Sequence, residues 1–443
     1  MQTRERAIGR SIFSATLPYN VLGSLFLLLA GCGGGSGGGG SMGPTGSGNS
    51  SPTVVTFKFT SGTPTVVAAR VGSGAFTAQT PSAGALSLSI PGGTSNFAVA
   101  FVCTLTLNGL AQIPEQFVFE ASTADGSTFN LPCPAPLPSG QTGTLTGSFD
   151  SSGVPGVTAV NIVATNGTYT TVSGAPLNGA FALAEPTGTD RVLVLAYGQS
   201  QQSMQNSLLA ARNLPNQTVP GTLNAGIPVV LGPGDETSPQ AITYNNVPSG
   251  YASPSTIVGF ILGNAGGFTV AGPATTQYPA LPAAAVQSGD YYKFLASASS
   301  LSTRDEEVLV LTNSASGGPV SFTFPTPWSY AGPTPAALPS FNFAYTGFPD
   351  KTGVMESAVV GWTTATGISV FFEVNATANY QNGSTTLAFP DLSGLAGFLP
   401  APTTGLAVAW TAEILHASAG ATLVMPSNTT GSAVANGGSF TVP

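Results

Sequence analysis

Charged side chains are scarce in this chain of 443 residues: 10 are Lys or Arg and 18 are Asp or Glu, together 6% of the sequence. A typical soluble domain has roughly 25%. Surface helices need a charged face and tolerate Gly and Pro poorly, and this chain has 57 Gly and 36 Pro. The composition therefore nearly excludes long surface helices.

Histidine is rarer still, since His416 is the only one. One imidazole cannot form a cluster of His ligands, and it leaves a Ser-His-Asp arrangement with a single candidate base. We interpret His416 as a residue at the end of a strand rather than as a base. We accordingly expect no metal site, no cofactor and no catalytic residue, and a protein that is not an enzyme.

A run long enough to span a membrane as a helix is not found in the N-terminal region. The apolar run Val21–Ala30 has ten residues, whereas a helical span needs about 20. Apolar residues still make up 42% of the chain, with 25 Phe, so we expect folded cores rather than disorder. Because the chain exceeds the size that one core usually serves, we expect several domains.

The N-terminus has the order of features of an export signal. Arg4, Arg6 and Arg10 precede the apolar run, which ends in Leu29-Ala30-Gly31-Cys32. This ending resembles the lipobox of bacterial lipoproteins. The resemblance implies that residues 1–31 are a signal peptide and that Cys32 becomes the acylated first residue, which anchors the protein in the lipid bilayer. An ordinary export signal with a coincidental Cys is the alternative.

Residues 32–52 are almost entirely Gly and Ser and predict a flexible tether, with a reach of roughly 25 Å. Gly33 stands where an acidic residue would signal inner-membrane retention, so the resemblance implies the outer membrane of the cell envelope. Without residues 1–31 the chain keeps 7 basic and 17 acidic residues, a net charge of −10. Such a body is repelled by phosphate backbones, which excludes nucleic acid as a partner.

Beyond the tether, apolar and polar residues alternate in short runs between turns. In Val54–Thr60, the residues Val55, Phe57 and Phe59 share one face, and similar rows occur at 368–374 and 406–414. Alternation of this kind is typical of strands with one buried face. We therefore predict an all-β fold of tandem antiparallel β-sandwich domains, immunoglobulin-like or transthyretin-like, with one helix at Ser203–Asn213.

A repeat supports the tandem arrangement. Gly84–Cys103 matches Gly179–Gly198 at seven of 20 positions, 95 residues apart, and Leu281–Ala298 is a weaker copy. The spacing is about that of one immunoglobulin-sized domain. Each copy predicts a hairpin, and further hairpins are expected at Gln116–Leu131 and Glu307–Phe324. We place sandwiches at 53–138, 139–235, 236–332 and 333–443.

The segment 143–198 resembles the carboxypeptidase-regulatory, transthyretin-like sandwich. The similarity is carried by its turn residues Asp150, Gly153, Pro155 and Gly156. That family supplies structural or binding modules without catalytic residues, so the resemblance implies a binding or structural role here.

Two cysteines remain after lipidation of Cys32. Cys103 and Cys133 form an even pair in an exported chain, which favours a disulfide within the first sandwich. Its loop closure would stabilise that sandwich by about 3–4 kcal/mol. Two buried thiols are the alternative.

Aromatic residues supply the candidate ligand-binding set: Tyr291, Tyr292, Trp328 and Tyr330. Tyr291 and Tyr292 begin a strand, so we expect one of the two rings to face outward. Rings on an uncharged polar surface can stack on sugars, and they can equally pack between domains.

The chain supports two functions from different classes. The first is a non-enzymatic surface lipoprotein with a structural, adhesive or ligand-binding role, whose partner is a glycan or an envelope protein. The alternative is a cell-surface hydrolase that processes polysaccharides with carboxylates of the last two sandwiches, namely Asp305, Glu307, Glu373 and Glu413. We expect Glu373 and Glu413 to be exposed on the polar faces of their strands.

Overall fold

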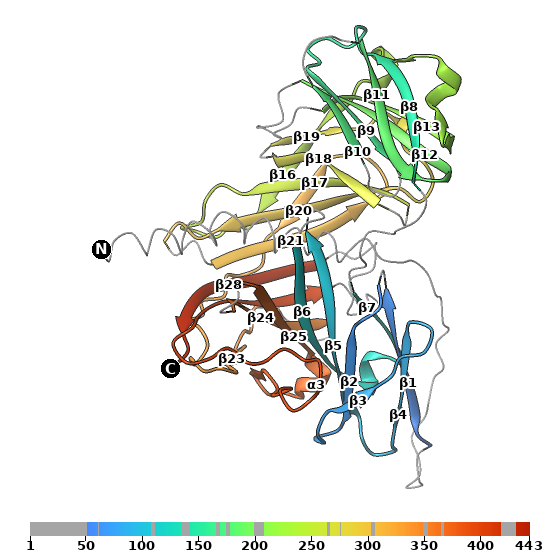
Figure 1. The fold of residues 1–443 in the computed structure, drawn as a ribbon. Coiled ribbons are helices and arrows are strands. Elements are labelled where there is room, and N and C mark those ends of the chain that lie inside the picture. Colours follow the sequence, from blue (N-terminus) through green and yellow to red (C-terminus); the bar gives the residue numbers. More distant parts are fainter. Residues whose placement is uncertain are drawn as a thin grey trace.

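A computed structural model gives the fold, which is nearly all β-strand (Figure 1). It describes residues 51–60, 62–107, 111–133, 142–164, 169–173, 178–198, 208–263, 266–274, 276–302, 306–348, 353–364, 367–417 and 431–443. The predicted all-β fold of β-sandwich type is confirmed. The signal peptide, Cys32, Asp305 and the tether before residue 51 lie outside the described residues.

One arrangement of strands occurs four times along the chain. In each copy, a main sheet of four strands packs against a smaller sheet, and we number the copies sandwich 1 to sandwich 4. The boundaries predicted near residues 138, 235 and 332 fall between the four groups of strands. The division into domains itself stays a prediction.

Sandwiches 1 and 2 each bury a core of their own between the two sheets. Sandwich 1 has the small sheet β4-β1-β7 and the main sheet β3-β2-β5-β6. Its strands are β1 (Thr53–Thr60), β2 (Val66–Val71), β3 (Thr77–Gln79), β4 (Ala85–Ile90), β5 (Asn96–Leu107), β6 (Ala111–Ser122) and β7 (Thr128–Pro132), with the short helix η1 (Thr123–Asp125) before β7.

Sandwich 2 repeats this order, with the small sheet β11-β8-β14 and the main sheet β10-β9-β12-β13. Its strands are β8 (Thr142–Asp150), β9 (Ala159–Ala164), β10 (Tyr169–Ser173), β11 (Asn178–Pro186), β12 (Gly188–Tyr197), β13 (Leu208–Val219), β14 (Gly221–Thr222) and β15 (Val229–Val230), with η2 (Leu223–Gly226) and η3 (Pro233–Asp235).

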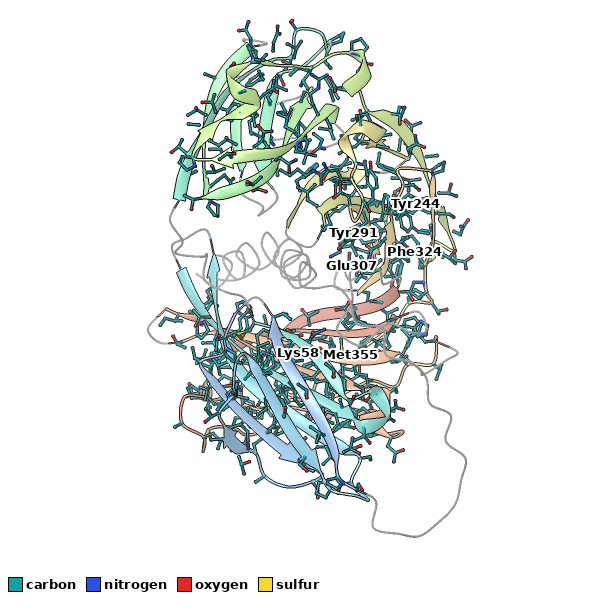
Figure 2. All side chains as sticks on the ribbon, turned by 90° about the vertical axis from the view of Figure 1, so that its right-hand side faces the viewer. Lys58, Tyr244, Tyr291, Glu307, Phe324 and Met355 are labelled. Carbon is teal, nitrogen blue, oxygen red and sulfur yellow. A yellow bond between two sulfur atoms is a disulfide. The ribbon has the colours of Figure 1, made fainter. Side chains whose placement is uncertain are left out.

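Sandwich 3 has the small sheet β19-β16-β22 and the main-sheet order β18-β17-β20-β21. Its strands are β16 (Ser238–Asn245), β17 (Ser255–Leu262), β18 (Gly266–Ala274), β19 (Gln277–Ala280), β20 (Tyr291–Ser299), β21 (Glu306–Ser314) and β22 (Val320–Thr323), with η4 (Ala283–Ala285). Figure 2 shows Tyr244 and Phe324 in this sandwich, where their rings stack 6.1 Å apart.

Sandwich 4 has the small sheet β23-β26 and the main-sheet order β25-β24-β27-β28. Its elements are β23 (Ser340–Asn342), β24 (Val354–Thr363), β25 (Ser369–Thr377), α3 (Ala378–Gln381), β26 (Thr386–Ala388), β27 (Ala407–Ala417) and β28 (Gly431–Thr441).

The main sheets of sandwiches 3, 4 and 1 join edge to edge into one sheet of twelve strands. β21 pairs with β28 in antiparallel register, and β25 pairs with β6 in parallel register. We call face A the side of Val118, Val374 and Val434, which packs with the small sheets of sandwiches 3 and 4. Face B is the other side, where Phe117 packs with the small sheet of sandwich 1.

The alternating patterns behave as expected at most positions. Val55, Phe57 and Phe59 are all buried, and so are Trp410 and Ile414 in β27. Some runs, such as Val192–Ala196, are apolar without alternation because both faces are covered. One face of this run belongs to the core of sandwich 2 and the other packs into the core shared with sandwiches 3 and 4.

Two predictions about local structure are wrong. The helix expected at Ser203–Asn213 is replaced from Leu208 onward by β13, because pairing with β12 outweighs the local helix propensity; residues 203–207 lie outside the described residues. The expected hairpins are also wrong. β4 pairs with β1 and β5 with β2, so the turn between β4 and β5 crosses from one sheet to the other.

The same correction applies to the hairpins at Gln116–Leu131 and Glu307–Phe324. β7 and β22 pair in parallel register with the first strands of their sandwiches, β1 and β16. Alternation shows that one face of a strand is buried, but it does not show which strand is its hydrogen-bonded partner. The pattern is therefore the same for a hairpin and for two successive strands that lie in different sheets. The two best-matched repeat copies occupy equivalent positions, β4–β5 and β11–β12.

The predicted disulfide between Cys103 and Cys133 is confirmed. Cys103 lies on β5 in the main sheet of sandwich 1, and Cys133 directly follows β7 of its small sheet. Both residues are buried. The bond therefore links the two layers of the sandwich.

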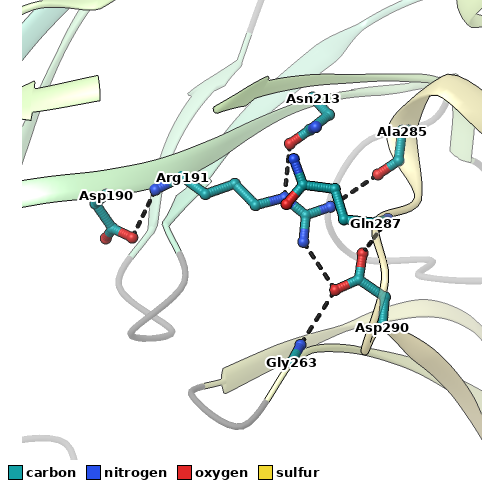
Figure 3. Close-up of polar contacts among 7 residues, drawn as sticks. All are labelled: Asp190, Arg191, Asn213, Gly263, Ala285, Gln287 and Asp290. Carbon is teal, nitrogen blue, oxygen red and sulfur yellow. Dashed lines mark hydrogen bonds and ion pairs between the residues drawn. The ribbon is translucent and has the colours of Figure 1, made fainter. Parts of the chain in front are cut away.

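A buried ion pair joins sandwich 2 to sandwich 3 (Figure 3). Arg191 of β12 donates to Asp290, at 2.8 Å, and their side chains are only 10% and 2% exposed. Arg191 also donates to the Asn213 side chain and the Ala285 carbonyl. Asp290 further accepts the backbone N–H groups of Gly263 and Gln287. All the hydrogen-bonding partners of Arg191 and Asp290 described here thus belong to sandwich 2 or to sandwich 3.

We expect Arg191→Ala to lower the free energy of unfolding by about 3–5 kcal/mol, because it leaves the Asp290 carboxylate buried without its counter-ion. Urea unfolding would measure the loss, and limited proteolysis would show whether sandwich 2 separates. Arg212→Ala is the control for the attachment of sandwich 2, since the Arg212–Asp235 pair lies within that sandwich, with side chains 40% and 8% exposed. Separation of sandwich 2 in both variants would contradict this assignment.

Candidate functional site

A pocket of about 370 Å³ opens on face A, where sandwich 3 meets sandwich 4. Glu306 begins β21 and pairs with Asn436 of β28, so the two side chains lie side by side across the junction. The described residues that line the pocket are Glu306, Tyr330, Ala331, Gly332, Pro333, Pro335, Trp410, Asn436, Gly437, Gly438, Ser439 and Phe440. We call it the junction pocket.

One wall of the junction pocket is the indole of Trp410, and two glycines make room for it. A Cβ on Gly438 would lie 2.9 Å from the Trp410 ring, and one on Gly332 would lie 3.1 Å from it. Gly332 also has a φ of +108°, which other residues rarely adopt. Both positions therefore require glycine for the indole to sit where it does.

The second aromatic wall is Tyr330, which is half-buried. Its ring stacks on Trp328, with centroids 4.8 Å apart, and meets Trp410 edge-on at 5.6 Å. Its hydroxyl accepts the backbone N–H of Asn342. Trp328 is buried behind it, and the Trp328 carbonyl accepts a hydrogen bond from the Asn436 side chain at 2.6 Å. The ring of Tyr330 is thus held in place from two sides.

The other predicted aromatics do not reach this pocket. Tyr292 is fully buried, where its hydroxyl accepts the backbone N–H of Leu281 and its ring packs on Phe260. Tyr291 is only 7% exposed (Figure 2). The expectation that one of these two rings faces outward is wrong, because the side chains on both faces of β20 are covered.

Three of the predicted carboxylates, Glu307, Glu373 and Glu413, lie on face B, opposite the junction pocket. Glu306 and Glu307 are neighbours in β21 and therefore point to opposite faces (Figure 2 labels Glu307). Glu413 pairs with Ala435, which in turn pairs with Glu307. Since neighbouring strands are about 4.8 Å apart, the Cα atoms of Glu413 and Glu307 lie about 10 Å apart.

Two further glutamates extend this row across the second junction. Glu373 of β25 pairs with Phe117 of β6, two residues along from Glu115. We call Glu115, Glu307, Glu373 and Glu413 the carboxylate row. Glu307, Glu373 and Glu413 are half-buried rather than exposed, because their strands lie inside the twelve-stranded sheet. The expectation of exposure for Glu373 and Glu413 is corrected accordingly. Glu115, which the sequence reasoning missed, comes from sandwich 1 through the parallel junction.

The pKa values of the row are raised. Burial, and then the nearby charges of Glu307 and Glu373, raise the pKa of Glu413 to about 8. Burial and the charge of Glu373 raise the pKa of Glu115 to about 7. Burial also raises the pKa of Glu373, although the Asn375 side chain donates to it and opposes the shift. Some members of the row are therefore protonated near neutral pH.

His416 is the last residue but one of β27, and its ring stacks on Phe348 with centroids 5.0 Å apart. In the described part of the chain, no group of three or more His, Cys, Asp and Glu side chains is placed to hold a metal ion. Among the same residues, no helix is both long and apolar enough to cross a membrane.

No protein-family model and no curated protein matches the chain. Solved structures with partial similarity include a leucine-rich repeat protein from Bacteroides thetaiotaomicron (14% identity, 41% of this chain, 27% of that one, TM-score 0.15). They also include the tip fimbrial protein Mfa3 from Porphyromonas gingivalis (10% identity, 40% of this chain, 80% of that one, TM-score 0.16). A third is the TIE protein of Bacillus anthracis (10% identity, 62% of this chain, 50% of that one, TM-score 0.14).

We expect Glu413→Gln to stabilise the protein at pH 8 by about 1–3 kcal/mol, since a pKa difference of one corresponds to about 1.4 kcal/mol. A carboxyl whose pKa rises on folding holds its proton in the folded state, so the wild type loses stability as the pH rises from about 4.5 to about 8. Thermal unfolding at pH 5 and pH 8 measures this. The gain should be small at pH 5, and the exposed Glu236→Gln should show none at either pH. A gain independent of pH would contradict the assignment.

Proposed function

We propose that this chain is a lipid-anchored protein of the bacterial cell envelope, at the outer membrane, with a recognition or structural role rather than a catalytic one. The basic, apolar and small residues that end in Cys32 support the anchor. A Gly- and Ser-rich tether would hold the sandwiches away from the bilayer.

The observation that carries the proposal is the continuous twelve-stranded sheet. Backbone pairing at β21–β28 and β25–β6 joins sandwiches 1, 3 and 4, and the Arg191–Asp290 pair fixes sandwich 2 to sandwich 3. Tandem sandwiches linked only by their chain would move independently. A body joined in this way presents its surfaces in fixed positions, which suits an exported protein that must hold a ligand or a neighbour.

We expect Cys32→Ser to abolish acylation, because it removes the residue proposed to carry the acyl chains. The protein should then leave the membrane fraction, since stable anchoring depends on those chains. Incorporation of a labelled fatty acid and fractionation of cells measure the two effects. Ser36→Ala, in the same tether, should change neither. Unlabelled wild-type protein, or unchanged membrane retention of Cys32→Ser, would refute the anchor.

The carboxylate row favours a second candidate function, hydrolysis of a polysaccharide. A general acid must be protonated at working pH and stand near an ionised carboxylate. The raised pKa of Glu413 supports the first of these two conditions, and Glu307 and Glu373 are the neighbouring carboxyls. The row, however, lies on the face opposite the junction pocket.

We expect no release of reducing ends from a panel of polysaccharides by the wild-type protein between pH 5 and pH 8. Activity that is present in wild type and in Glu236→Gln, but lost in Glu413→Gln, would favour the hydrolase instead.

A further inference from the structure

We propose that the junction pocket binds a neutral sugar residue of a glycan, held against the rings of Tyr330 and Trp410 and hydrogen-bonded by Glu306 and Asn436. This inference rests on the proposed recognition role and names the class of ligand and the site that takes it.

The size and the lining of the pocket suit a small polar ligand. Its volume of about 370 Å³ falls within the range of roughly 300–1,000 Å³ that small-molecule sites occupy. The lining combines three aromatic residues with a carboxylate, an amide, a hydroxyl and the backbone of three glycines. A sugar presents the matching surfaces, namely C–H faces that pack on a ring and hydroxyl groups that both donate and accept.

The polar groups supply both kinds of hydrogen-bonding partner. Glu306 is an acceptor, and one of its oxygens already accepts the hydroxyl of Tyr251 at 3.3 Å, which orients the carboxylate. The Asn436 side chain carries both a carbonyl acceptor and N–H donors, while Trp410, which is only 8% exposed, adds ring surface to the pocket. Asn436 is held by the carbonyl of Trp328.

The charge of the pocket narrows the class of ligand. Of the described residues that line it, none is basic and one, Glu306, is acidic. Phosphorylated, sulfated and carboxylated ligands would meet only a negative charge, so they are disfavoured. A quaternary ammonium ligand could use the rings and the carboxylate, but most of the lining offers hydrogen-bonding groups that such a cation would leave unused. These features favour an uncharged polyhydroxyl ligand.

The lining residues of the pocket are held in fixed positions, although they come from two sandwiches. Glu306 comes from sandwich 3, whereas Tyr330 and Trp410 belong to the segment before β23 and to β27. The backbone pairing of β21 with β28 sets Glu306 beside Asn436. The stack of Tyr330 on Trp328 fixes the aromatic wall independently of any ligand. Little side-chain ordering would therefore accompany binding.

The test uses the full-length protein in detergent on an array of neutral oligosaccharides built from hexoses and N-acetylhexosamines, followed by calorimetry with the oligosaccharides that bind. Tyr330→Ala should weaken binding at least tenfold, while Tyr330→Phe should keep most of the affinity. Ala331→Trp, at an exposed residue of the lining, should block the pocket without disturbing the core, so the test does not depend on Tyr330→Ala folding. Tyr345→Ala is the matched control, because Tyr345, which follows β23, is also half-buried but does not line the pocket.

Three results would overturn the inference: no neutral oligosaccharide bound, binding unchanged by both Tyr330→Ala and Ala331→Trp, or binding of choline in place of the sugars when choline is titrated by the same calorimetry. If sugars fail to bind while acylation of Cys32 anchors the protein, the inference fails and the proposed envelope location stands. Loss of the Cys32 anchor alone would overturn only that location.

Discussion

Backbone pairing between sandwiches is the interaction on which the rest of this molecule depends. At β21–β28 and β25–β6, strands that would be open edges of separate domains become interior strands of one sheet. Open edges are sites of unwanted association, and here the chain closes two pairs of them on each other. Sandwich 4 takes the central position, so its main sheet holds sandwiches 1 and 3 at fixed distances.

Both groups of candidate functional residues lie at these junctions. The junction pocket needs Glu306 from one sandwich and Trp410 from the next, on face A. On face B, Glu115 of β6 and Glu373 of β25 lie diagonally across the second junction, the one between β25 and β6. Side chains from different sandwiches meet only because the strands pair in register, which makes register the link between fold and site.

The sequence predicted the fold class well because alternation is a local property. Val55, Phe57 and Phe59 show their shared face within seven residues, and the repeated turn at β4–β5 and β11–β12 marks equivalent places. The same local signal could not say which strand each one pairs with. The turns expected to close hairpins instead cross between sheets, and β13 replaces a helix because its partner strand, β12, lies elsewhere in the chain.

The candidate site was harder to predict from the sequence, because local patterns do not show which segments of the chain meet. Tyr330 was found by its aromatic character, whereas Tyr292 has the same character and is fully buried. No periodicity separates them, because the difference comes from what covers each of the two residues. The opposite directions of Glu306 and Glu307 did follow from alternation. The approach of Glu115 to Glu373 joins residues far apart in the chain and carries no local signal.

The parallel junction has a consequence for how the chain is assembled. β6 ends at Ser122, and its partner β25 begins at Ser369, so more of the chain is synthesised between the two strands than any one sandwich contains. Sandwich 1 can build its core and its disulfide early, but one edge of it stays unpaired until sandwich 4 has been synthesised. Contacts between such distant segments form slowly, and an unpaired edge invites other strands. Synthesis from the N-terminus thus leaves sandwich 1 as a folded unit with one exposed edge, and this interval is when the chain is most open to unwanted strand pairing.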